Sequence, residues 1–202
     1  MSADKSWEKG YDMAKFNYYD ALERLSVLSS RAVFIACSAT LPAHKGELAA
    51  LKITADKAIC ELERSLFSDF MPPLERSDIA ACAHAFSRVI GAAYELSSVR
   101  GRESLLLERK NKEAEICIRL SQMIEEGVSS LRRLKRPDQL PDLVRFRRLL
   151  CDARVWHASV QRKLSAGIYP RSAQCYLSLL RALCHSLDVC FDTLIEIMLS
   201  NI

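Results

Sequence analysis

The stretch LFSDFMPPLERSDI, residues 66–79, decides the fold that this sequence predicts. Two adjacent prolines, Pro72 and Pro73, are followed by Ser77 and Asp78 just before an apolar run. Proline removes a backbone donor, and the residue before it avoids helical angles, so the prolines predict a break between helices. We expect Ser77 or Asp78 to cap the second helix by accepting a backbone N–H bond. The stretch therefore predicts a turn between antiparallel helices.

Apolar residues recur three and four positions apart on both sides of this turn, which indicates amphipathic helices. The same spacing continues through the chain, and Glu113 falls within one of these apolar stripes. The first two predicted helices cover about 11–40 and 43–70, and the third starts after the two prolines and has its apolar stripe from Ile79 to Leu96. The last three cover about 103–135, 141–166 and 171–202. Gly167 is expected to end the fifth of them. Because no segment alternates with a period of two, we predict an all-α fold of six antiparallel helices and no sheet.

The composition is that of a globular helical protein, with 50% apolar residues, 27% charged residues and only 6 glycines and 6 prolines. No run of about 18 residues is free of charge, so no membrane span is expected. The first 16 residues are polar and lack the apolar core of a signal peptide. We therefore predict a cytoplasmic protein, and leave open an association with the inner membrane.

The two halves of the chain resemble each other weakly. Residues 55–73 align with residues 153–170, and this alignment places Pro72 opposite Pro170. Amphipathic helices match by chance easily, but a proline at the same offset favours a real duplication. We predict one domain, 1–202, built from repeat units of about 11–100 and 103–202.

The segment ADKAICELERSLFSDFMPPLERSDIAACAHAFSRVI, residues 55–90, resembles the second and third helices of the PhoU-like family. Its proteins are phosphate transport regulators or accessory proteins of phosphate permeases. The turn FSDFMPPLERSDI carries the resemblance, and the six-helix duplicated layout agrees with it. The resemblance implies two three-helix units in one bundle, a regulatory role exerted by binding other proteins, and acidic helix motifs that hold metal ions.

The positions of those acidic motifs are mostly basic or apolar in this sequence. They hold Lys52 and Asp56 in the second helix, Ser87, Arg88 and Gly91 in the third, Leu150 and Arg154 in the fifth, and Arg181, Ala182 and His185 in the sixth. The remaining candidate metal ligands are Asp56, His185, Asp188 and Asp192. Since lysine and arginine repel a cation, we predict no cofactor, and leave a bound metal ion open. The alternative interpretation of these residues is a solvated polar face.

Histidines and cysteines supply no further site in the sequence. His157 lies on an apolar stripe, so we expect it in the core or at its boundary. None of the eight cysteines forms a C-x-x-C pair, and we expect them to be small buried hydrophobic residues. A metal ligand or a catalytic thiolate is the alternative.

The strongest charge asymmetry lies in residues 130–150, which contain seven basic residues and only two aspartates. The net charge of the whole chain is only +4, so the rest of the sequence is nearly neutral. The basic residues are Arg132, Arg133, Lys135, Arg136, Arg145, Arg147 and Arg148. They indicate either a solvated helix hairpin or a docking surface for an acidic protein or an anionic membrane. Nucleic acid is disfavoured, because Phe146 is the only aromatic residue among them.

No nucleophile elbow, dinucleotide fingerprint or P-loop occurs in the sequence, which disfavours an enzyme. We therefore predict a non-enzymatic regulatory or accessory protein that binds a phosphate permease or another membrane transporter. Two alternatives stay open: a metal-storing or metal-sensing bundle, and a helical adaptor unrelated to phosphate. A homo-oligomer is also left open.

Overall fold

The computed structural model of the chain describes residues 16–38, 45–99, 112–134, 137–169 and 173–201. Within these ranges the chain forms six α-helices and one short 3-10 helix, and no strand. Their bounds are α1 (Tyr18–Cys37), α2 (Lys45–Ser68), α3 (Arg76–Ser98), α5 (Lys112–Leu131), η1 (Pro137–Gln139), α6 (Leu143–Ser165) and α7 (Ala173–Ser200). The all-α prediction with six helices is confirmed.

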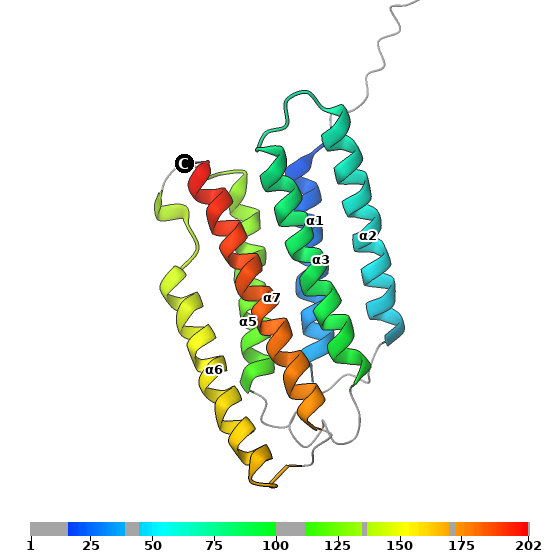
Figure 1. Cartoon of the computed structure of the whole chain (residues 1–202). Helices are drawn as coiled ribbons and strands as arrows, with labels where there is room; N and C mark the ends of the chain where they lie inside the picture. The colour runs from blue at the N-terminus through cyan, green and yellow to red at the C-terminus, as the bar shows by residue number, and fades with distance from the viewer. Residues whose placement is uncertain (1–15, 39–44, 100–111, 135–136, 170–172, 202) are drawn as a thin grey trace, which may run out of the picture.

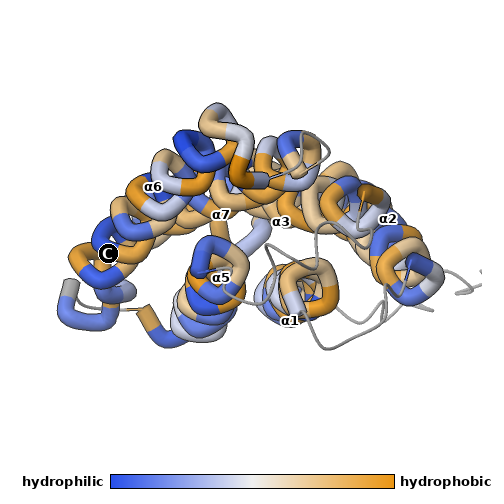
Figure 2. The backbone as a smooth tube through the Cα atoms, turned by 90° about the horizontal axis from the view of Figure 1, so that it is seen from below, coloured by the Kyte–Doolittle hydropathy of each residue, from blue (hydrophilic) through white to orange (hydrophobic). Residues whose placement is uncertain are grey.

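Four helices form the centre of the bundle, and two cover its sides (Figures 1 and 2). In the centre α1 packs against α3 and α5, and α7 packs against the same two helices. The outer helix α2 lies against α1 and α3, while the outer helix α6 lies against α5 and α7. One outer helix thus belongs to the first three helices along the chain, and the other to the last three. That the two halves are a duplication remains a prediction.

The turn between α2 and α3 falls where the two prolines predict it. α2 ends at Ser68 and α3 begins at Arg76, while Leu66 and Phe86 on either side of the turn are buried in the core. Just outside it, Phe67 and Phe70 expose about nine-tenths of their surface, at 91% and 90%. The turn therefore closes a buried core and presents a strongly apolar outer edge.

The predicted cap of α3 is wrong. Glu75 occupies the N-cap position and makes no side-chain capping bond, so Ser77 and Asp78 lie inside the first helical turn. The Glu75 carbonyl accepts the backbone N–H of Ile79 at 3.0 Å, which starts the helix earlier than expected. Asp78 instead accepts a hydrogen bond from Ser200 at the end of α7, at 3.4 Å.

Asp142 and Gly167 define the limits of α6. The Asp142 side chain accepts the backbone N–H of Arg145 at 2.9 Å, an N-cap bond. At the other end Gly167 has a φ of 73°, and the N–H of Ile168 reaches back to the carbonyl of Lys163 at 3.0 Å. This is the hydrogen-bond pattern of a Schellman motif. The prediction that Gly167 ends the helix is confirmed.

The cysteines divide into two groups. Five are buried, as expected: Cys37, Cys82, Cys117, Cys184 and Cys190. The expectation is wrong for Cys60, Cys151 and Cys175, which are exposed because they fall on the outer faces of their helices. Burial raises the pKa of the Cys82 thiol to about 12. Such a thiol stays protonated and is a poor nucleophile.

No helix within the described ranges has the length and apolar character needed to cross a membrane.

Candidate functional site

The predicted basic residues of 130–150 do not form one uniform surface. Arg132 forms an ion pair with Asp20 of α1, and its guanidinium carbon lies 5.6 Å from the centre of the Tyr19 ring. Arg147 instead pairs with two aspartates of α7. Lys135 and Arg136 lie outside the described residues. Two of the predicted docking residues are therefore already engaged inside the molecule.

Arg133, Arg145 and Arg148 differ from these two. All three are exposed, and none has a carboxylate partner within the described part of the chain. We call them the free arginines. Arg133 follows the end of α5, and the other two lie in the first turns of α6. They lie at the two ends of the α5–α6 connection, and none of them has to break an ion pair with a described residue before it binds a partner.

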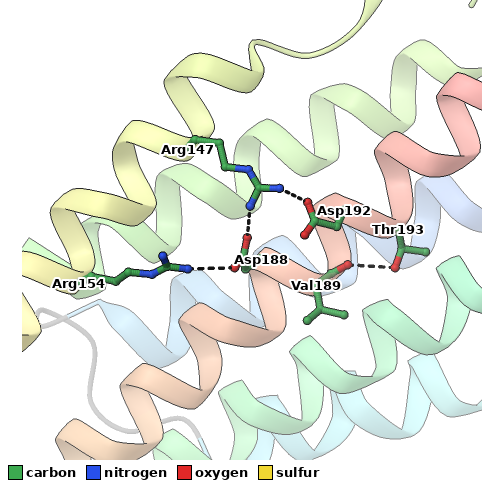
Figure 3. Close-up of polar contacts among 6 residues, drawn as sticks. All are labelled: Arg147, Arg154, Asp188, Val189, Asp192 and Thr193. Atoms are coloured by element: carbon green, nitrogen blue, oxygen red, sulfur yellow. Dashed lines mark hydrogen bonds and ion pairs between the residues drawn. The ribbon is translucent and has the colours of Figure 1, made fainter.

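The candidate metal ligands do not come together as a cation site. Asp188 binds Arg147 at 2.8 Å and Arg154 at 3.5 Å, and Asp192 pairs with Arg147 (Figure 3). Asp56, on α2, pairs with Lys52 at 3.1 Å. Within the described ranges no group of three His, Cys, Asp or Glu side chains is placed to hold a metal ion. The residues present do not fit the cation that the PhoU-like resemblance implies, because each of these carboxylates is already paired with an arginine or a lysine.

A groove of about 1010 Å³ lies between α6 and α7, with α5 at its floor. Leu150, Arg154, His157, Ala158 and Gln161 line its α6 wall. Gln174, Ser178, Arg181, Ala182, Cys184, His185 and Asp188 line its α7 wall, and Glu113 of α5 closes the floor. Five of these residues stand where the family resemblance places its acidic motifs: Leu150, Arg154, Arg181, Ala182 and His185. The sequence therefore aligned the correct faces of α6 and α7.

The floor of the groove holds a buried polar pair. An Oε atom of Glu113 lies 3.2 Å from Nδ1 of His157, and the two side chains are only 2% and 12% exposed. Burial raises the pKa of Glu113 to about 8, and Arg181 opposes part of that rise. Burial also lowers the pKa of His157, and Arg181 lowers it further. Both pKa shifts favour the uncharged forms of the two side chains at neutral pH, and this assigns the carboxyl of Glu113 as the donor and Nδ1 of His157 as the acceptor.

Sequence reasoning found only half of this pair. The prediction that His157 lies in the core or at its boundary agrees with its 12% exposure. Glu113 was recognised only as a member of an apolar stripe, although a carboxyl on such a stripe requires a buried partner. That partner is 44 residues away on another helix, and no local pattern indicates it.

No protein-family model and no curated protein matches this sequence. Among solved structures, the fold is similar to that of a PhoU-like protein from Shewanella oneidensis MR-1. The two structures agree with a TM-score of 0.65 over 92% of this chain and 97% of that one, at 13% sequence identity. The PhoU-like fold that the stretch 55–90 predicted is confirmed. This chain is a six-helix bundle with the fold of a PhoU-like protein.

Proposed function

We propose that this protein is a non-enzymatic regulatory or accessory protein that acts by binding another protein at the cytoplasmic side of a membrane. The fold supports this proposal, because it is shared with a PhoU-like protein along nearly the whole chain. The sequence resemblance of the turn at 66–79 points in the same direction. A regulator of this kind acts only through contacts that differ between the states of its partner.

The free arginines are the observation that carries the proposal. Arg133, Arg145 and Arg148 are exposed and have no carboxylate partner within the described residues. An arginine binds a carboxylate through two parallel N–H bonds, which lysine cannot do. We expect the partner to present acidic side chains, and the cytoplasmic face of a phosphate permease or another transporter is the first candidate.

The test measures binding of the purified protein to a phosphate permease in nanodiscs of uncharged lipid, at low and high salt. We expect wild-type protein to bind and the complex to weaken with salt, because exposed charge pairs are screened. Changing Arg133, Arg145 and Arg148 together to Gln should remove most of the binding. The matched control changes Arg24, Arg64 and Arg88 to Gln, three exposed arginines on α1, α2 and α3.

The control removes the same net charge at other places. The two triple variants therefore distinguish binding through a local surface from attraction by the total charge of the molecule. Equal loss in both would contradict a local docking surface. Undiminished binding by the α5–α6 variant would also overturn the proposal. Binding to empty nanodiscs of anionic lipid, with none to the permease, would assign the surface to the membrane instead.

A further inference from the structure

The α6–α7 groove lies beside an outer helix, α6, that buries fewer apolar residues than the other outer helix, α2. α2 and α6 have nearly the same length, 24 and 23 residues. Yet α2 buries six apolar residues, whereas α6 buries four: Phe146, Leu150, Ala153 and Val160. Beyond the stacked rings of Phe146 and Phe191, 3.5 Å apart, polar side chains line both walls. The facing helix surfaces therefore leave an open volume between them instead of an apolar seam.

Hydrogen-bond donors outnumber free acceptors in this groove. Arg181 has no carboxylate partner within the described residues, and Arg154 is 75% exposed with one long contact of 3.5 Å to Asp188. The two carboxyl groups are already engaged, because Glu113 is bound to His157 and Asp188 is bound to Arg147. The groove thus has one guanidinium group, Arg181, without a carboxylate partner in the described residues, and a second, Arg154, that is held only by its 3.5 Å contact with Asp188.

We propose that this groove binds a small molecule that carries a phosphate group, held between Arg154 of α6 and Arg181 and His185 of α7. The donors come from opposite walls, and the tetrahedral oxygens of a phosphate point in several directions and meet both. A carboxylate offers two oxygens along one edge and satisfies one wall at a time. The double negative charge of a phosphate also matches two guanidinium groups better than a single charge does.

The size and the remaining lining of the groove fit a phosphate ester rather than a bare ion. A volume of about 1010 Å³ lies at the upper end of the range of small-molecule sites, so the groove has room for more than a bare ion. Leu150, Ala158 and Ala182 provide apolar contacts, and the amides of Gln161 and Gln174 meet at 3.4 Å across the walls. These groups would contact the organic part of the ligand.

The proposal goes beyond the docking function, because the groove residues and the free arginines are different sets. A partner could bind while the groove is empty, and a phosphate ester could bind in the absence of a partner. The two proposals therefore stand or fall on separate variants.

The test is isothermal titration calorimetry of the full chain with glycerol 3-phosphate and inorganic phosphate, and with acetate as a carboxylate probe. We expect saturable binding of the phosphate ester and weak or no binding of acetate. Arg154→Gln and Arg181→Gln should each raise the dissociation constant at least about 10-fold, since a hydrogen bond to a charged group is lost. Arg24→Gln, an exposed arginine of α1, should leave it unchanged.

Each result bears on the proposal. Tighter binding of inorganic phosphate than of the ester would assign the site to the free ion and overturn the ester. No heat with either probe, or equal affinity in Arg181→Gln and wild type, would overturn the site itself. Circular dichroism of each variant confirms that it is folded. The triple variant of the free arginines should bind the ester normally, which separates the groove from docking.

Discussion

Glu113 is 2% exposed on the face of α5 that otherwise packs the core. A buried carboxyl is tolerated only if it is neutral or well paired; here burial favours the neutral form, and His157 is the hydrogen-bond partner. The native protein therefore retains a proton on Glu113 that the unfolded chain releases at a pH above about the ordinary value of 4.5. This residue makes folding stability depend on pH.

The predicted consequence is a fall in the free energy of unfolding as pH rises from 5 to 8, because only the native state still binds this proton in that range. Replacing Glu113 with Gln removes the proton and should reduce the fall by roughly 2–4 kcal/mol. Urea denaturation of the wild type and of Glu113→Gln at several pH values measures this difference in the free energy of unfolding. The lowered pKa of His157 adds stability as pH rises toward 6.5. Its causes are burial and Arg181, which both proteins keep, so we expect this opposite contribution in both.

The matched control is Glu115→Gln, because Glu115 is an exposed carboxylate two residues away on α5. It should follow the pH dependence of the wild type. If Glu113→Gln follows it as well, Glu113 is ionised in the native protein and the neutral pair is wrong.

At the scale of the element, the sequence predicted which segments are helical better than where they begin. The apolar periodicity sums over many residues, so all six helices were found. A boundary depends on a few hydrogen bonds, and at α3 the carbonyl of Glu75 took the role expected of Ser77 or Asp78. Gly167 was predictable because a left-handed residue at a helix end strongly favours glycine.

Two glycine-to-alanine changes should have opposite effects on stability. Gly167→Ala forces a side chain into a φ of 73° and should cost about 1 kcal/mol. Gly91→Ala lies inside α3, where an added Cβ meets nothing within 4 Å, and should stabilise by about 0.5–1 kcal/mol. Thermal denaturation compares the two variants with wild type. Stabilisation by Gly167→Ala would contradict the α6 cap described above.

At the scale of the whole molecule, the turn at 66–79 and the six helices predicted the bundle, but not the gap between α6 and α7. How closely two helices pack depends on which side chains meet across them, and that depends on the register of the whole assembly. The sequence identified Leu150, Arg154, Arg181, Ala182 and His185 as the positions of the family's acidic motifs, and all five line the groove. Their arginines were interpreted only as the loss of a cation site, since the sequence does not show that they surround an open volume.

Metal ions should therefore have little effect on the stability of this protein. Fe³⁺, Zn²⁺ or Mg²⁺ should raise the melting temperature by less than about 2 °C, because a ligand stabilises only as far as it prefers the folded state. Differential scanning fluorimetry of chelator-treated protein measures the shift. A rise of several degrees that disappears in His185→Ala or Asp192→Ala would show that the sixth helix does hold a cation.

The thin packing of α6 has a consequence for how the molecule opens. Local unfolding requires least free energy where few apolar groups are buried, and α6 buries four while the central helix α7 buries twelve residues. The amide hydrogens of α6 should therefore exchange with solvent deuterium earlier than those of α7, without unfolding of the central four helices. A molecule bound between α6 and α7 would slow that exchange, so one outer helix would report the occupancy of the groove on a timescale of minutes to hours.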